Sequence, residues 1–376
     1  MSEQRRWYQS RVVRGVAAGA TTAVAAGWAA QHRLVARAQA SAEDIEAEGL
    51  TLPDAVVHHD VEVDDGGRIH VVERGRGPAV VLLHGYMLSG ALWAHQLRDL
   101  AGEHRVIAPD LRGHGASVPG DAGFTAPTAP IPPAPGAGGE GDGDGRPALR
   151  DDVRMAAASA GSPGVRRMAT DVAAVLDALD VEHAVVVGHS MGGMVALQLV
   201  HDSPAAFVRR RVAGLALVST TGGPFSRMPG FGGMARLAGP VSARAMHLAD
   251  RWGVRTIASE DLRWWLTRMG FGADAPPSQV RFVESLHLAT APSTMASLLA
   301  SLALFDLSAW LGQLDLPVLV VVGSHDRLTP PRHAWRTAEA LPQAQLVELP
   351  RCGHMPMIER RREFARLVDE FAAKVR

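Results

Sequence analysis

The sequence predicts an α/β fold built on a mostly parallel sheet with helices on both of its faces. Short, continuous apolar runs alternate with helical stretches along most of the chain. Runs of this kind are typical of strands that are buried on both faces, as in a parallel sheet. They occupy 79–85, 105–110, 184–190, 214–220, 317–326 and 344–349. The alternation of strands and helices therefore indicates a doubly wound sheet.

An antiparallel hairpin is expected at one edge of this sheet. Residues 56–75 divide into two strand-like stretches, which are joined by the turn sequence DDGG at 64–67. Asp-Gly and Gly-Gly pairs permit the positive φ angles that tight hairpin turns require. Helices are predicted between the later strands, for example over 171–181 and 192–202.

Composition indicates a globular domain and argues against a nucleic-acid partner. The 376 residues include 38 Lys and Arg and 39 Asp and Glu, for a net charge of −1, and 47% of them are hydrophobic. Such a chain can bury a large core, and it has no block of basic residues that would form a nucleic-acid surface. Cys352 is the single cysteine, so no internal disulfide is expected.

Residues 1–40 form an N-terminal hydrophobic segment. Its uncharged stretch, 15–31, is rich in Ala, Gly and Thr, and arginines precede it. A spanning helix needs about 20 mostly apolar residues, so this stretch is slightly short. Three interpretations stay open: a membrane anchor that places the domain outside the cytoplasm, which we favour, a cleaved signal peptide, or a helix of a cytoplasmic protein. Residues 41–55 then read as a polar linker.

One globular domain is expected over 56–376, with two interruptions. Residues 118–164 are rich in Pro, Gly, Ala and Asp and nearly free of large apolar residues. A stretch of this composition cannot bury enough surface to offset its ordering entropy, so a disordered insertion is predicted. Residues 222–300 carry Met, Trp and Leu at irregular helical spacing between two core strands. We expect this second segment to form a helical cap over a pocket.

The sequence GHSMGG at 188–193 carries the most specific chemical signal in the chain. It follows a predicted buried strand and opens a predicted helix, which is the context in which G-x-S-x-G presents a nucleophilic serine. Gly188 and Gly192 are expected because the sharp turn leaves no room for side chains. The helix that follows directs backbone N–H groups toward the reacting centre. Ser190 is therefore the candidate nucleophile.

A serine hydroxyl needs a base to act as a nucleophile, and the base needs an acid that orients it. Among the 16 histidines, His354 stands directly after the last predicted strand, and Asp326 ends the predicted strand before that one. Loops at the carboxyl ends of strands are where α/β sheets gather their sites. The order Ser190, Asp326, His354 is that of hydrolases with a nucleophile elbow. The main rival acid, Asp315, precedes its strand and so belongs to the wrong end of the sheet.

The oxyanion of a tetrahedral intermediate needs two preorganised hydrogen-bond donors. The backbone N–H of Met191 is the expected first donor, and the N–H of Tyr86, in the loop after the third strand, is the candidate for the second. We interpret His84 in the same loop as a residue that organises the loop. The turn DLRGHGAS after the fourth strand is expected to be structural and not a metal site, with Asp110 and Arg112 bonding backbone.

Five motifs together resemble those of the α/β-hydrolase fold. They are HGY (84–86), DLRGHGAS (110–117), GHSMGG (188–193), GSHDRLTPP (323–331) and GHMPMIE (353–359). The chain is most similar to serine hydrolases of the lipase/esterase-like kind common in actinobacteria, many of which carry a short Ala-rich hydrophobic N-terminal segment. The resemblance implies a mostly parallel, eight-stranded sheet with a helical cap, and no cofactor or metal. It also implies a triad of Ser190, Asp326 and His354, with Tyr86 and Met191 as oxyanion donors.

The expected activity is hydrolysis of carboxylic esters with small apolar or lipid-like acyl groups, through an acyl-serine intermediate. A serine nucleophile suits acyl carbon, whereas relatives with an Asp nucleophile attack alkyl carbon. Apolar cap residues form a lid over the acyl chain or else bury against the core: Trp264, Trp265, Leu266, Met269 and Phe271. Two alternatives stay open. One is acyl transfer, perhydrolysis or C–C hydrolysis with the same triad, and the other is a non-catalytic binding protein on this fold.

Overall fold

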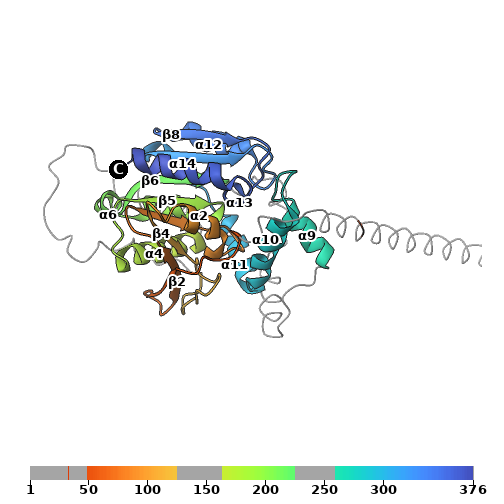
Figure 1. Cartoon of the computed structure of the whole chain (residues 1–376). Coiled ribbons are helices and arrows are strands. Elements are labelled where there is room, and N and C mark those ends of the chain that lie inside the picture. The colour runs from red at the N-terminus through yellow and green to blue at the C-terminus, as the bar shows by residue number, and fades with distance from the viewer. Residues whose placement is uncertain (1–32, 34–48, 125–162, 225–258, 376) are drawn as a thin grey trace, which may run out of the picture.

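The computed structural model describes residues 33, 49–124, 163–224 and 259–375, and these residues are organised around one eight-stranded sheet (Figure 1). The strand order is β1-β2-β4-β3-β5-β6-β7-β8. Pairing is antiparallel between β1 and β2 and between β2 and β4, and parallel everywhere else. The predicted α/β fold, with a mostly parallel eight-stranded sheet flanked by helices, is therefore confirmed.

The strands lie close to the predicted runs, and their burial follows their place in the sheet. Their bounds are β1 (Val57–Glu62), β2 (Arg68–Arg74), β3 (Ala79–Leu83), β4 (Arg105–Pro109), β5 (Ala184–His189), β6 (Val212–Val218), β7 (Val318–Gly323) and β8 (Ala344–Leu349). Every residue of the central strands β3, β5 and β7 is buried, whereas the edge strands β1 and β8 each have one buried residue and are otherwise exposed or partly exposed. Continuous apolar runs predict the central strands because both faces of the sheet are covered.

Helices cover the two faces of the sheet and divide the core between them. One face is covered by α4 (Pro163–Ala178), α5 (Met191–Asp202), α6 (Ala205–Arg211) and α12 (Pro331–Ala340); the other by η2 (Gly90–Trp93), α2 (Ala94–Asp99), α13 (Pro356–Glu359) and α14 (Arg361–Lys374). Successive side chains of a strand point to opposite faces, so Val81 and Leu83 pack with the first group and Val80 and Leu82 with the second. A short 3₁₀ turn, η4 (Leu311–Gln313), precedes β7.

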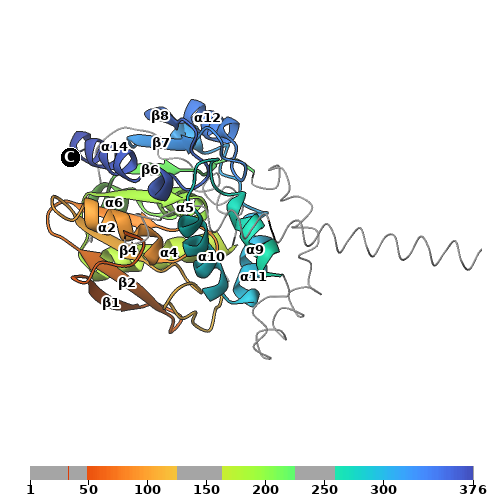
Figure 2. The same ribbon diagram turned by 45° about the vertical axis from the view of Figure 1, so that its right-hand side comes forward.

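Three helices lie within or just beyond the segment expected to form the cap, and in both overall views they lie beside one another at one edge of the molecule (Figures 1 and 2). They are α9 (Glu260–Arg268), α10 (Pro277–Ala289) and α11 (Pro292–Leu302). The Ser259 side chain caps α9 by accepting a hydrogen bond from the Leu262 N–H. A proline begins each of the other two helices, where its missing N–H costs nothing.

Several sequence predictions fall wholly or partly outside the described residues. The hydrophobic stretch 15–31, most of the linker, the insertion over 125–162 and the first part of the cap over 225–258 lie there. Residues 118–124 of the insertion are described, and Val118 pairs with Arg68 of β2. Among the helices of the described residues, none has the length and apolarity to cross a membrane.

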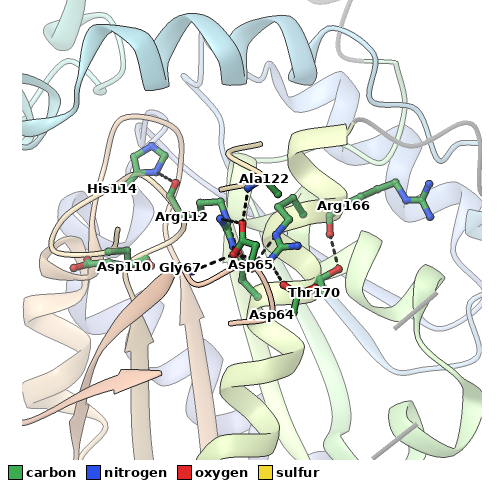
Figure 3. A network of polar contacts seen from close by, with 12 residues as sticks. Asp64, Asp65, Gly67, Asp110, Arg112, His114, Ala122, Arg166 and Thr170 are labelled. Atoms are coloured by element: carbon green, nitrogen blue, oxygen red, sulfur yellow. Dashed lines mark hydrogen bonds and ion pairs between the residues drawn. The ribbon is translucent and has the colours of Figure 1, made fainter. Parts of the chain in front are cut away.

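A buried charge network joins the β1–β2 turn, the loop after β4 and helix α4. We refer to Asp65, Arg112, Arg167 and Asp171 as the arginine network. Arg112 donates to Asp171 Oδ2 at 2.7 Å and to Asp65 Oδ2 at 2.8 Å. Figure 3 shows Asp65 also accepting from the backbone N–H of Ala122, at 3.2 Å. The described end of the insertion is thus held against the same carboxylate.

The expectation that Arg112 bonds backbone was wrong. Its side chain is fully buried, and a buried guanidinium needs charged partners to offset its lost hydration. Those partners come from the hairpin turn and from α4. Asp110, by contrast, does bond backbone, because its carboxylate accepts from the N–H groups of Gly90 at 2.6 Å and Ala116 at 2.9 Å.

Candidate active site

Ser190 lies on a sharp turn between β5 and α5. Its backbone has φ 52° and ψ −117°, which is a strained conformation for a residue with a side chain. Gly188 and Gly192 flank the turn because the backbone approaches itself there. A Cβ on Gly188 would lie 2.4 Å from the Gly192 carbonyl oxygen, and a Cβ on Gly192 would lie 2.3 Å from the Leu83 carbonyl oxygen. The turn therefore holds a half-buried serine at the carboxyl end of a central strand.

The N-terminus of α5 lies directly behind Ser190. The Ser190 carbonyl accepts hydrogen bonds from Gly193 N at 3.0 Å and from Thr220 Oγ1 at 2.6 Å, which fixes the turn on both sides. The first backbone N–H groups of a helix have no partner within the helix. Met191 N–H is one of these, and it donates to no group among the described residues. This is the N–H that the sequence predicts as the first oxyanion donor.

The loop after β3 contacts this turn and carries Tyr86. His84 organises the loop: Nδ1–H donates to the Gly85 carbonyl at 2.8 Å, and Nε2 accepts from Leu111 N–H at 2.8 Å. Full burial lowers the pKa of His84, which keeps the ring neutral and suits these two roles. The Tyr86 hydroxyl donates to the Met295 carbonyl of α11 at 2.6 Å. Its backbone N–H, like that of Met191, has no partner within the described part of the chain.

Asp326 and His354 form a buried, hydrogen-bonded pair. Nδ1 of His354 lies 2.8 Å from Oδ2 of Asp326, and because a carboxylate only accepts, Nδ1–H is the donor. Each residue is 4% exposed. Asp326 also accepts from Leu328 N at 2.9 Å, from Thr329 N at 2.8 Å and from Thr329 Oγ1 at 2.7 Å. Four hydrogen bonds thus satisfy the buried carboxylate. The bond from Nδ1–H also fixes the orientation of the His354 ring.

We refer to residues 350–355, the loop that carries His354, as the base loop, and to the turn that carries Ser190 as the serine turn. The base loop also contacts the serine turn. His189, which precedes Ser190 in the chain, lies 2.9 Å from the His354 carbonyl through Nε2, and the two rings are 4.8 Å apart. Burial lowers the pKa of His189 well below its ordinary value, so Nε2–H donates from a neutral ring. The structure therefore brings together the loops that carry Ser190, Asp326 and His354. Asp315 is at the opposite end of β7, where it accepts from Gln343 Nε2 at 2.8 Å.

Two polar residues at the site were not singled out from the sequence. Thr329 bonds Asp326 and lies 3.2 Å from Nδ1 of His354, and Glu359 accepts from the N–H groups on both sides of His354. Thr329 lies in the motif GSHDRLTPP and Glu359 in the motif GHMPMIE. A threonine or a glutamate at such a position does not by itself indicate a role at the site. Within the described residues, no group of three or more His, Cys, Asp or Glu side chains is arranged to hold a metal ion.

Comparison with known proteins identifies the family. Residues 78–361 match the alpha/beta hydrolase fold family, and the chain belongs to that family. It is 27% identical over 304 residues to the pimeloyl-[acyl-carrier protein] methyl ester esterase of Nitrosomonas europaea, a match that covers 80% of this chain and 98% of the relative.

Two further proteins show how broad this likeness is. The 2-hydroxy-6-oxo-6-phenylhexa-2,4-dienoate hydrolase of Burkholderia cepacia is 27% identical over 316 residues, covering 81% of this chain and 91% of the relative. The structure of a thermophilic esterase from Thermogutta terrifontis superimposes with a TM-score of 0.59 at 25% identity, covering 85% and 98% of the two chains. These relatives support hydrolase activity for this chain.

Proposed function

We propose that the protein is a serine hydrolase that cleaves carboxylic esters through an acyl-serine intermediate. The observation that carries the proposal is the buried Asp326–His354 hydrogen bond on loops that meet the Ser190 turn. Esterases among the similar proteins support the choice of ester substrates. A protein that only binds a ligand has no need of a strained serine, a base and an orienting acid together.

In the proposed mechanism, Ser190 Oγ attacks the acyl carbon while Nε2 of His354 takes its proton. Asp326 holds the ring through Nδ1–H and stabilises the imidazolium that forms. The backbone N–H groups of Tyr86 and Met191 stabilise the oxyanion, each worth about 3 kcal/mol in known cases. The imidazolium then gives its proton to the alkoxide, which departs as an alcohol. An acyl-serine remains. Water repeats the sequence and releases the acid.

We further propose that the acyl group is apolar, either small or lipid-like. The apolar residues of the cap divide into two sets: Trp264 and Phe271 are buried in the core, whereas Trp265, Leu266 and Met269 are between 40% and 56% exposed. The buried pair packs with the side of the core that includes Met355 of the base loop. Apolar side chains packed beside the base loop in this way support an apolar acyl site near His354.

The test compares the wild-type chain with Ser190→Ala on p-nitrophenyl esters from C2 to C16. Loss of a triad nucleophile typically lowers the rate by about 10⁶-fold, so Ser190→Ala should fall to background. A fluorophosphonate probe should label the wild type and leave the variant unlabelled. Labelling without ester turnover would favour acyl transfer, perhydrolysis or C–C hydrolysis. A folded wild type that is neither active nor labelled would overturn the proposal in favour of a binding protein.

Membrane attachment or export through the hydrophobic segment 1–40 is proposed from the sequence alone. The arginines before 15–31 support an orientation with the N-terminus in the cytoplasm. The test is to express the full chain and a chain that begins at residue 41, and to compare their distribution after cell fractionation. Recovery of both chains in the same soluble fraction would contradict attachment.

A further inference from the structure

The loop that carries His354 packs closely against neighbouring backbone. It runs between β8 and α13, and Gly353 approaches neighbouring backbone so closely that a Cβ there would lie 2.4 Å from Gly272 N. The imidazole is fixed on one side by Asp326. Its other nitrogen must be aimed at the nucleophile by the backbone that carries the ring, so the orientation of that backbone matters for catalysis.

Glu359, the last residue of α13, fixes this backbone on both sides of the base. Its Oε1 accepts from Gly353 N at 3.0 Å and from Met355 N at 3.2 Å, and these are the residues directly before and after His354. The carboxylate is half-buried in the fold. Burial raises the pKa of Glu359 despite these backbone hydrogen bonds. A carboxylate is rarely desolvated without a specific role for its oxygens.

The same carboxylate reaches the turn that follows α9. Glu359 Oε2 accepts from Gly272 N at 2.7 Å, and the backbone N–H of His354 donates to the Gly270 carbonyl at 2.7 Å. One hydrogen bond therefore joins the base loop to residues 270–272 directly, and the Glu359 carboxylate of α13 bridges the loop to the same turn. Arg268, the last residue of α9, holds that turn from its other side by donating to the Gly272 carbonyl at 2.7 Å and to the Ala273 carbonyl at 2.8 Å.

We propose that Glu359 is a positioning residue for the general base, and that it makes the placement of His354 depend on the turn after α9. This inference rests on the proposed function, because it needs His354 to be the base. Contacts that move α9 then reach the reacting centre through this carboxylate and through the direct hydrogen bond from the His354 backbone N–H to the Gly270 carbonyl. Displacement of a catalytic group by about 1 Å can cost about 10²-fold in rate.

Glu359→Gln is the direct test, because it keeps the size of the side chain and removes one of the two accepting oxygens. We expect kcat on p-nitrophenyl acetate to fall by about 10- to 100-fold with KM within about twofold of wild type. The fluorophosphonate labelling rate should fall in parallel. Glu359→Asp, which keeps the charge, should recover part of the loss. Glu363→Gln is the matched control, since that carboxylate is 40% exposed and pairs only with Arg360 among the contacts described.

Arg268→Met provides a second variant that leaves the base loop intact. It loosens the turn after α9, and it should lower kcat a few-fold in the same direction. A Glu359→Gln protein that folds and retains wild-type kcat would overturn the inference while Ser190→Ala still supports the proposed function. A change confined to KM, or a loss of kcat that matches the loss of folded protein, would also overturn it. Inactive, unlabelled wild type would instead refute the proposed function.

Discussion

The arginine network and the Asp326–His354 pair are both buried carboxylate sites, but their carboxylates bond to different kinds of nitrogen group. In the network, Arg112 is fully buried and carries a permanent charge between Asp65 and Asp171. In the pair, the partner is an imidazole, which can exist in a neutral or a protonated form. A guanidinium cannot release its proton, whereas an imidazole can take one up and give it back. The first arrangement suits a structural role and the second a chemical one.

The carboxylates of the network show how strongly their surroundings act on them. Burial disfavours the charged form of Asp65, but Arg112 outweighs burial and holds its pKa below the ordinary value. For Asp171 burial prevails, and its pKa is raised despite the same arginine. A buried network of this kind is costly to break, because removal of one partner leaves the others desolvated. The two sites should therefore fail in different ways when they are mutated.

The largest expected effect is on catalysis, from Asp326→Asn. An amide nitrogen in place of Oδ2 cannot accept from Nδ1–H, so the ring adopts the wrong tautomer and kcat should fall by about 10⁴-fold. The midpoint of thermal unfolding should shift little, because the remaining oxygen still accepts backbone hydrogen bonds. Steady-state kinetics and calorimetry measure the two effects. Asp315→Asn, at the exposed end of β7, is the control, and equal losses in both variants would contradict the assignment.

Arg112→Met should give the opposite result. It removes the cation that donates to both Asp65 and Asp171 and leaves them paired with Arg167 alone within the network, so the free energy of unfolding should fall by about 3–5 kcal/mol. The activity per folded molecule should stay near wild type. Denaturant titration with active-site labelling measures both quantities. Arg68→Met removes an ion pair with Asp60 in which both side chains are nearly half exposed, and it should change stability by no more than about 1 kcal/mol. A large loss of stability in Arg68→Met would remove the expected difference between the buried and the exposed ion pair.

Tyr86→Phe tests a neutral contact between α11 and the loop after β3 that carries Tyr86. The variant loses the hydrogen bond from the phenol to the Met295 carbonyl, at a cost of about 1 kcal/mol of stability. We expect a few-fold decrease in kcat, because the loop that carries the Tyr86 N–H is then less firmly held. Chemical denaturation and ester kinetics on the same samples provide the measurement. An unchanged kcat would show that α11 does not position this loop.

The smallest effect is expected from a second Asp–His pair, which joins β2 to the loop after β4. His70 Nδ1 lies 2.9 Å from Asp110 Oδ2, and this hydrogen bond raises the pKa of His70 above 6.5. The protonated form is favoured in the folded state, so the pair stabilises the protein fully below about pH 6.5. That contribution is lost as the pH rises through the folded-state pKa of His70. Asp110 stays charged across this window, since its own pKa is lowered even though burial opposes the change.

Unfolding measured from pH 6 to 9 tests the contribution of the His70–Asp110 pair. The wild type should lose stability across the window, and His70→Asn should flatten the dependence. His183→Asn is the control, because that side chain is exposed. An unchanged pH dependence in His70→Asn would show that another group is responsible.

The sequence predicted the sheet and the candidate triad because both follow from local patterns. Continuous apolar runs mark the buried strands, and Ser190, Asp326 and His354 each stand in the turn or loop that follows one. The contacts that fix those residues could not be predicted in the same way. The Tyr86–Met295 and Glu359–Gly272 hydrogen bonds join positions 209 and 87 residues apart. The partners of Arg112 were mispredicted for the same reason, since they lie 47 and 59 residues away.

The strained backbone at Ser190 has a consequence for how this chain changes under selection. A φ of 52° with ψ −117° costs a residue with a side chain about 1–3 kcal/mol, and glycine would relieve most of that cost. Ser190→Gly should therefore raise the melting temperature while it abolishes the proposed activity. A library screened for heat resistance alone would enrich glycine at this position and lose turnover. Only a screen that also requires catalysis would keep the serine.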